Sequence, residues 1–242
     1  DLSGLTGQKA VIEIIDRHDA NPDDAALAFI LLDEIRQSPS AAVQPLPTSV
    51  VSTVDGHDQA LKLDMGDPNP FYYNGSYYLY YLQNIGNHSW SLVKTDDLIS
   101  SSFPREVLSA SGAADAADQW LGSGSVIQAQ DGQLHLFYTG HNKNLTPVEV
   151  AMRAQSAGTD LYNWVTQPDQ QFSGSAGYSD YDFRDPMVVW NAQQQNYWML
   201  ITSRYNNQAA IGLYTSTDLQ NWAPQAPLYL EDSALNLEVP DY

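Results

Sequence analysis

The chain has 242 residues, no cysteine and a formal net charge of −19. A charge this negative repels phosphate, which argues against nucleic acid or an anionic membrane as partner and suits a neutral substrate such as a sugar. Without cysteine no disulfide or thiolate metal site can form, and the five histidines lack metal-ligand spacing. We therefore expect no metal and no cofactor. The acidic composition is typical of a soluble exported protein, so we expect a secreted or periplasmic location.

Residues 1–38 differ in pattern from the rest of the chain. Residues 10–16 form an apolar, strand-like run, and a polar turn separates them from a second apolar run at 28–35. The second run suits a short helix or a strand; we favour a strand, because continuous apolar runs of this length are typical of sandwich strands. Residues 39–58 are rich in Pro, Ser and Ala, which predicts a linker.

A repeat begins near residue 60. Each unit has a hairpin of alternating aromatic and apolar residues, followed by an edge strand that ends in an Asp-Leu turn. The expected hairpins cover 71–81, 126–138 and 187–201, and the turns lie at Leu98, Leu161 and Leu219. In the first hairpin an Asn-Gly pair stands between two aromatic runs, which is a strong hairpin signal. A step of about 60 residues matches one four-stranded propeller blade, so the sequence predicts an all-β propeller.

Short polar motifs precede the apolar strands at a similar spacing of about 53 to 61 residues. They are Gly66-Asp67-Pro68-Asn69-Pro70, Gly122-Ser123-Gly124-Ser125, Arg184-Asp185-Pro186 and Glu238-Val239-Pro240-Asp241. Residues at the same place in successive blades lie at the same depth around one axis, so we expect Asp67, Asp185 and Glu238 to meet in one pocket. Glycosidic bonds are cleaved by such carboxyl groups, because one donates a proton while another attacks the sugar or activates water.

The order of these motifs resembles glycoside hydrolase family 32, the invertases, inulinases and levanases that act on β-fructosides. The run Tyr-Leu-Tyr-Tyr-Leu-Gln at 78–83 and the turn at 216–222 add to the resemblance, which covers about residues 61–242. It implies a five-bladed β-propeller, of which this chain holds about three blades and the start of the fourth. The remaining blades are expected from the rest of a longer chain or from a second polypeptide. Gly66, Pro70, Gly122 and Val239 depart from the usual motifs of the family.

The resemblance also implies the domain organisation. Residues 1–38 resemble, more weakly, the end of a β-sandwich accessory module found ahead of such enzymes. We therefore expect this module at 1–38, a linker at 39–58 and a partial catalytic propeller at 59–242.

By the same resemblance, the catalytic residues are Asp67 as nucleophile, Glu238 as acid/base and Asp185 as the group that holds the sugar and stabilises the transition state. The reaction would be hydrolysis, with retention, of terminal β-fructosyl bonds in sucrose or fructans. Since the acid must hold a proton near the working pH, we expect the pKa of Glu238 to be raised. Candidate substrate-binding residues are Asn69, Gln83, Trp90, Ser125 and Arg184, although Gln83 also suits a hairpin cap and Trp90 suits packing between blades.

Other functions fit the same residues. One alternative is an inverting arabinofuranosidase or xylosidase like those of glycoside hydrolase family 43, also a five-bladed propeller with three acids. A second is a carbohydrate-binding propeller without catalysis. Transfer of fructose to a sugar instead of water also stays open.

Overall fold

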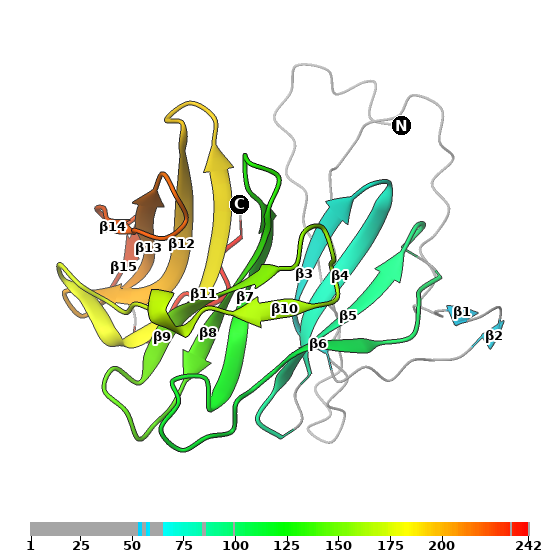
Figure 1. Ribbon diagram of the computed structural model, residues 1–242. Coiled ribbons are helices and arrows are strands. Elements are labelled where there is room, and N and C mark those ends of the chain that lie inside the picture. The colour runs from blue at the N-terminus through cyan, green and yellow to red at the C-terminus, as the bar shows by residue number, and fades with distance from the viewer. Residues whose placement is uncertain are drawn as a thin grey trace, which may run out of the picture. The chain divides into compact units, whose positions relative to one another are not determined.

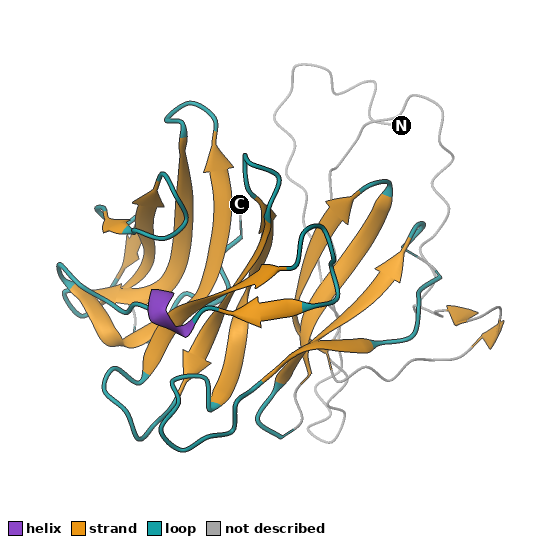
Figure 2. Cartoon of the chain, in the orientation of Figure 1, coloured by secondary structure: helices purple, strands orange, loops and turns teal. Residues whose placement is uncertain are grey.

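The computed structural model describes residues 53–54, 57–58, 65–83, 86–98, 100–232 and 234–241. The expectations for residues 1–38 lie outside the described residues. Within the predicted linker, Thr53–Val54 (β1) and His57–Asp58 (β2) form a two-residue antiparallel ladder. Within the described ranges, helical structure is confined to the 3-10 turn Pro168–Gln170 (η2), drawn in purple in Figure 2. That part of the chain has no helix long and apolar enough to span a membrane.

Three antiparallel sheets of consecutive strands make up residues 65–232, and we call them blades 1, 2 and 3 (Figure 1). Blade 1 contains Met65–Tyr73 (β3), Ser76–Gln83 (β4), Ser89–Thr95 (β5) and Arg105–Ser109 (β6). Blade 2 contains Trp120–Gln128 (β7), Leu134–His141 (β8), Glu149–Ser156 (β9) and Trp164–Thr166 (β10). Blade 3 contains Tyr178–Asn191 (β11), Asn196–Tyr205 (β12), Gln208–Ser216 (β13), Ala223–Pro224 (β14) and Tyr229–Glu231 (β15). The predicted partial β-propeller is confirmed.

The outer strand of blade 3 is divided in two. β14 pairs with β13 at Tyr214 and Thr215, and β15 pairs with the same strand further along, at residues 209–211. Residues 234–241, where the sequence predicts the opening of a fourth blade, pair in no strand among the described residues.

The tight turns follow the local chemistry that the sequence predicts. Asn74 and Gly75 join β3 to β4 with φ of 49° and 87°, the positive values that a two-residue hairpin turn requires. The recurring turn is built alike in blades 1 and 3: the hydroxyls of Thr95 and Ser216 each accept the N–H three residues later, at 2.9 Å. Both turns place a leucine at φ 60°.

Apolar side chains fill the two interfaces between the blades. The cluster between blades 1 and 2 includes Tyr80, Trp90 and Leu136, all fully buried. The cluster between blades 2 and 3 includes Phe137 and Phe183, with exposed fractions of at most 2%. These continuous cores fix each blade against the next, and so fix the relative positions of groups carried by different blades.

The innermost strand of each blade is irregular at one equivalent place. The pairing register shifts between Gly66 and Asn69 in β3, between Gly122 and Gly124 in β7, and between Arg184 and Met187 in β11. At Gly124 the strands approach so closely that a Cβ atom would lie 1.9 Å from the carbonyl oxygen of Phe137. Such bulges bend a strand and redirect its side chains. Each one coincides with a polar motif of the sequence.

Candidate active site

One pocket of about 520 Å³ collects the polar motifs of the three blades and of the C-terminal segment. Asp67, Asp185 and Glu238, the three acids expected to meet, all line it. Its other lining residues are Leu82, His88, Trp120, Leu121, Gly122, Ser123, Thr139, His141, Lys143, Glu149 and Arg184. The pocket lining therefore contains the cluster of carboxyl groups that the motif spacing predicts.

Asp67 occupies the bulge of β3 in an uncommon backbone conformation. Its φ is 47°, in the left-handed region that non-glycine residues seldom adopt and that costs about 1–3 kcal/mol. The hydroxyl of Ser123, in the bulge of β7, donates a short hydrogen bond to its Oδ2. A donor from blade 2 therefore orients a carboxylate from blade 1.

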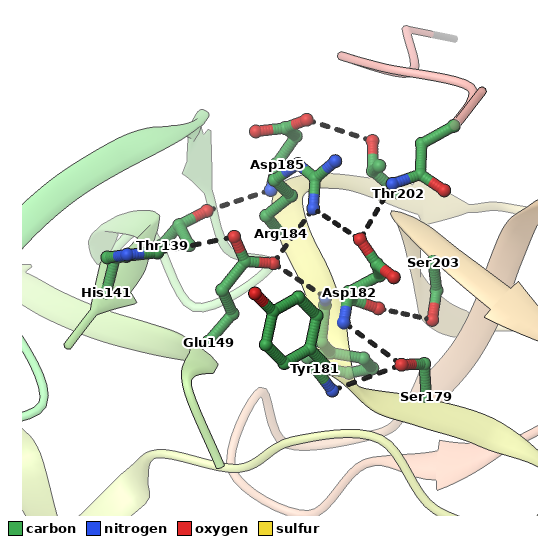
Figure 3. Close-up of polar contacts among 12 residues, drawn as sticks. Thr139, His141, Glu149, Ser179, Tyr181, Asp182, Arg184, Asp185, Thr202 and Ser203 are labelled. Carbon is green, nitrogen blue, oxygen red and sulfur yellow. Dashed lines mark hydrogen bonds and ion pairs between the residues drawn. The ribbon is translucent and has the colours of Figure 1, made fainter. Parts of the chain in front are cut away.

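Asp185 lies in the bulge of β11, also at positive φ (58°), and is the most buried of the three acids with 7% exposure. Thr202 Oγ1 donates to its Oδ2 at 2.9 Å, and the backbone N–H of Val239 donates to the same oxygen at 3.1 Å. Burial raises the pKa of Asp185 to about 6, although these two hydrogen bonds oppose the change. Its own N–H donates to Thr139 Oγ1 at 2.8 Å (Figure 3).

Glu238 stands on the C-terminal segment and is bound to Arg184 by two parallel hydrogen bonds. Arg184 Nε donates to Oε2 at 3.0 Å, and Nη2 donates to Oε1 at 2.5 Å. Bidentate pairs of this kind are among the strongest in proteins. The hydrogen bonds from Arg184 lower the pKa of Glu238. The expectation of a raised pKa for Glu238 is therefore wrong, because the hydrogen-bonded guanidinium of Arg184 favours the ionised carboxylate.

The backbone also corrects how Glu238 corresponds to the other two acids. Asp67 and Asp185 each have positive φ and precede a proline; in the C-terminal segment the residue with both properties is Val239, at φ 48°. Glu238 therefore corresponds to the residue before each aspartate, which is Arg184 in blade 3. The acids meet in one pocket, as expected, but Glu238 does so from a different backbone position.

Arg184 is also bound from its other side. Its Nη1 donates to Glu149 Oε2 at 3.0 Å and to Asp182 Oδ1 at 3.1 Å, so the guanidinium lies between these two carboxylates (Figure 3). Asp182 in turn accepts the side-chain amide of Asn236 at 2.7 Å. Because Asn236 belongs to the same segment as Glu238, residues 234–241 are attached to blade 3 through Asn236, Glu238 and Val239, among other contacts.

Blades 1 and 2 also contribute aromatic and basic groups to the pocket lining. The rings of His88 and Trp120 meet edge to face at 5.7 Å between centroids, and His88 Nδ1 lies 3.1 Å from the carbonyl oxygen of Leu121. Trp120 is 38% exposed, so its ring has a free surface on which a sugar can stack. His141 and Lys143 add polar and basic groups from the end of β8 and the following loop.

The predicted substrate-binding residues divide into two groups. Arg184 lines the pocket, whereas Asn69, Gln83, Trp90 and Ser125 do not. Trp90 is fully buried in the core between blades 1 and 2, and its Nε1 donates to the carbonyl of Gly122 at 3.0 Å. Gln83 accepts the hydroxyl of Ser91 at 3.2 Å. The alternatives of hairpin support for Gln83 and packing for Trp90 describe these contacts better than sugar binding.

Two of these residues connect neighbouring blades. Asn69 Oδ1 accepts the N–H of Val126 at 3.1 Å. The fully buried hydroxyl of Ser125 donates to the carbonyl of Pro186 and accepts the N–H of Val188, both at 2.9 Å. Because β7 and β11 are the end strands of their sheets, one edge of each has no neighbouring strand, and these side chains supply hydrogen bonds that the sheets cannot make.

Several pocket residues were not identified as candidates from the sequence, among them Thr139, His141 and Glu149. Glu149 carried the clearest signal, because it is a carboxylate at the start of a strand that is otherwise buried, Val150–Ala154. A charged residue in such a run is either paired or functional. Thr139 and His141 follow an apolar strand and give no comparable signal.

The described residues hold no group of three or more His, Asp or Glu arranged to bind a metal ion. The site instead offers a carboxylate oriented by a hydroxyl, a buried carboxyl group that holds its proton up to about pH 6, and a carboxylate paired with a cation. Three acids around one cavity, two of them with pKa values moved in opposite directions, suit acid/base chemistry on a neutral substrate.

The family model described as "Glycosyl hydrolases family 32 N-terminal domain" matches residues 57–242. The chain belongs to glycosyl hydrolase family 32. It is 28% identical over 201 residues to an insoluble beta-fructofuranosidase isoenzyme (CWINV4) of Arabidopsis thaliana, covering 77% of this chain. It is 27% identical over 213 residues to a fructan 1-exohydrolase of Leymus chinensis, covering 82% of this chain.

Solved structures of family 32 share its fold. Fructan 1-exohydrolase IIa of Cichorium intybus superposes with a TM-score of 0.59 at 24% identity, covering 69% of this chain and 33% of that protein. The beta-fructofuranosidase BmSUC1 of Bombyx mori gives a TM-score of 0.54 at 28% identity, covering 71% and 37%. The chain spans about a third of the length of the curated relatives it matches, 33% and 34% for the two named above.

Proposed function

We propose that this family 32 chain is the catalytic part of a retaining β-fructosidase that releases terminal fructose from sucrose or fructans. The observation that carries the proposal is the presence of Asp67, Asp185 and Glu238 in the lining of one pocket. Relatives named as beta-fructofuranosidase and fructan 1-exohydrolase support the substrate class.

In this proposal Asp67 attacks the anomeric carbon of fructose. The hydroxyl of Ser123 donates to its Oδ2, which limits rotation of the side chain. Glu238 gives a proton to the leaving oxygen and then takes one from water. The covalent intermediate forms on Asp67, and its hydrolysis restores both carboxyl groups.

Asp185 has a supporting role. Its carboxyl group is held by Thr202 and Val239 and faces the same cavity. We assign it to fructose hydroxyls, which a fixed carboxylate binds more strongly as charge develops on the sugar ring. Export of the protein also stays a proposal, based on the acidic composition.

The experiment is an assay of the product of the complete gene on sucrose, inulin and levan, beside Asp67→Ala and Glu238→Ala. We expect free fructose from the parent and a loss of at least about 10³-fold in each variant. Absence of fructose from every substrate, with folded protein, would contradict the proposal. Binding of fructosides without turnover would then favour the carbohydrate-binding propeller.

Two further readouts separate the related reactions. NMR of the first product shows whether the anomeric configuration is retained, and inversion would favour chemistry like that of family 43. Oligosaccharides that accumulate at high sucrose would show fructosyl transfer, the activity by which a relative from Festuca arundinacea, sucrose:sucrose 1-fructosyltransferase, is named.

A further inference from the structure

Glu149 is a buried carboxylate in the pocket wall that the proposed reaction does not use. It opens β9 in blade 2, and its side chain is 11% exposed. Its Oε2 accepts hydrogen bonds from Nη1 of Arg184 at 3.0 Å and from the backbone N–H of Phe183 at 2.9 Å. Its Oε1 lies 3.4 Å from His141 Nδ1. A carboxylate from blade 2 therefore holds a guanidinium from blade 3.

One guanidinium thus faces three carboxylates, from Glu149, Asp182 and Glu238. Glu149 and Asp182 each have a further fixed donor, Phe183 N–H for the first and the Asn236 amide for the second. These donors fix the positions of both carboxyl groups. Glu238 has the side chain of Asp185 as its further hydrogen-bond partner, and its own side chain is the most exposed of the three, at 51% against 11% and 20%. It is therefore the member of the group that can exchange a proton with substrate or solvent.

This arrangement bears on the protonation of the proposed acid/base. A cation alone beside Glu238 would keep it ionised, and an ionised group cannot protonate a leaving oxygen. Two further negative charges on the same cation oppose that effect, because they repel the charge on Glu238 and compete for the N–H donors of Arg184.

We propose that Glu149 is a positioning residue whose negative charge, together with that of Asp182, holds Arg184 in place and weakens its hold on Glu238, so that Glu238 can carry the catalytic proton. The inference rests on the proposed function, since it assumes that Glu238 is the acid/base. Glu149 acts through Arg184 and does not touch the reacting atoms.

The pocket brings titratable groups from every neighbouring element to face Glu238 and Arg184. They are Asp67 from β3, His88 before β5, His141 from β8, Lys143 from the following loop, Glu149 from β9, and Asp182 and Asp185 from β11. Among these, Glu149 and Asp182 are the carboxylates with a direct hydrogen bond to Arg184.

The test is the pH profile of kcat for fructose release from sucrose in Glu149→Gln, made in the product of the complete gene. Gln keeps the side-chain length and an oxygen that can accept Phe183 N–H, but it removes the charge. The pKa of Glu238 should fall, so the alkaline limb should move to lower pH by about 0.5 to 1 unit. Asp182→Asn should move it in the same direction. Asp169→Asn, an equal charge change at an exposed position of η2, should leave it in place.

A second measurement reports the same protonation without turnover. With glutamate labelled with carbon-13 at the carboxyl carbon, the NMR titration of Glu238, assigned by its loss in Glu238→Gln, should have a lower midpoint in Glu149→Gln. An unchanged or raised midpoint would overturn the proposal, and so would an alkaline limb that stays in place in both variants. If Glu149→Gln fails to fold, the same two measurements on Asp182→Asn test the proposal. A parent that releases no fructose contradicts the proposed function, whereas an active parent with unmoved variants contradicts only this inference.

Discussion

The backbone N–H of Val239 donates a hydrogen bond of 3.1 Å to Oδ2 of Asp185, although 54 residues separate them in the sequence. Val239 has φ 48°, which is a true outlier for a β-branched residue. Pro240 follows it, and Glu238 precedes it. The bond therefore fixes a strained backbone beside the proposed acid/base. Asp185 in this way helps to determine where Glu238 lies.

Replacing Asp185 by Asn should stabilise the fold and impair the reaction. Because burial raises the pKa of Asp185 to about 6 from 3.8, the folded state binds a proton more tightly than the unfolded state, and stability falls as pH rises through this window. The asparagine amide cannot ionise, and its oxygen can still accept the two hydrogen bonds. At pH 7 we expect the free energy of unfolding to rise by up to about 2 kcal/mol in Asp185→Asn, measured by urea denaturation.

The same variant should lose turnover, because the amide lacks the charge that the proposed transition state requires. Asp169→Asn is the matched control and should change neither quantity by more than about 0.5 kcal/mol. A variant that is less stable than the parent at pH 7 would show that ionised Asp185 is stabilised by its surroundings.

Removing the cation at Arg184 should move the pH profile in the direction opposite to Glu149→Gln. Without the guanidinium, the pKa of Glu238 should return toward its ordinary value, so the alkaline limb of kcat should shift to higher pH in Arg184→Gln. We also expect kcat to fall about tenfold or more, since the two parallel bonds that place Glu238 are lost.

Arg184→Lys separates charge from geometry. Lysine keeps the positive charge but cannot make a bidentate bond. The variant should therefore lose activity while its alkaline limb stays near that of the parent. A limb that moves to lower pH in Arg184→Gln would contradict the pairing seen here.

Ser125→Ala should destabilise the junction of blades 2 and 3. The change leaves the carbonyl of Pro186 and the N–H of Val188 buried without their partner, at a cost of about 2–4 kcal/mol. Urea denaturation measures the cost, and Ser111→Ala, at an exposed position, is the control. If stability is unchanged while KM for sucrose rises, Ser125 binds substrate after all, as the sequence predicted.

His135 should make the fold sensitive to acid. It is 6% exposed, its Nδ1 has no hydrogen-bond partner among the described residues, and burial lowers its pKa to about 4 from 6.5. The unfolded state therefore binds more protons between these values, and stability falls as pH drops through the window. Relative to His135→Gln, the parent should lose up to about 2 kcal/mol between pH 6.5 and 4. Parallel stability curves for the two proteins would show that His135 is not the titrating group.

The blade repeat, the hairpins and the meeting of the three acids could be predicted from the sequence, because each depends on local signals repeated at a regular spacing. Asn74-Gly75 specifies its turn by itself. The partners of these residues were not readable in the same way. Thr139 bonds Asp185 across 46 positions, and Glu149 bonds Arg184 across 35. Both contacts join regularly paired strands of blade 2 to the bulge of β11, and no local pattern in the sequence marks the two partners.

The two errors about Glu238 have the same origin. Its motif aligns with the other acids by spacing and by a nearby proline, but Val239 separates Glu238 from Pro240, and the backbone aligns Val239 with Asp67 and Asp185. Its pKa depends on Arg184, and the sequence places these residues 54 positions apart with no sign that they pair. The fold can be predicted from periodic patterns in the sequence, whereas the pKa of Glu238 depends on a contact between residues that are distant in the sequence.

The shared conformation of Asp67, Asp185 and Val239 has a consequence for how such a site can change by descent. In each case the residue has positive φ and is followed by proline, whichever side chain is attached. The fold thus has three equivalent backbone positions, occupied by an aspartate in blades 1 and 3 and by an apolar residue in the C-terminal segment. A single amino-acid substitution at one of these positions can therefore change its contribution to the reaction while the sheet behind it stays the same.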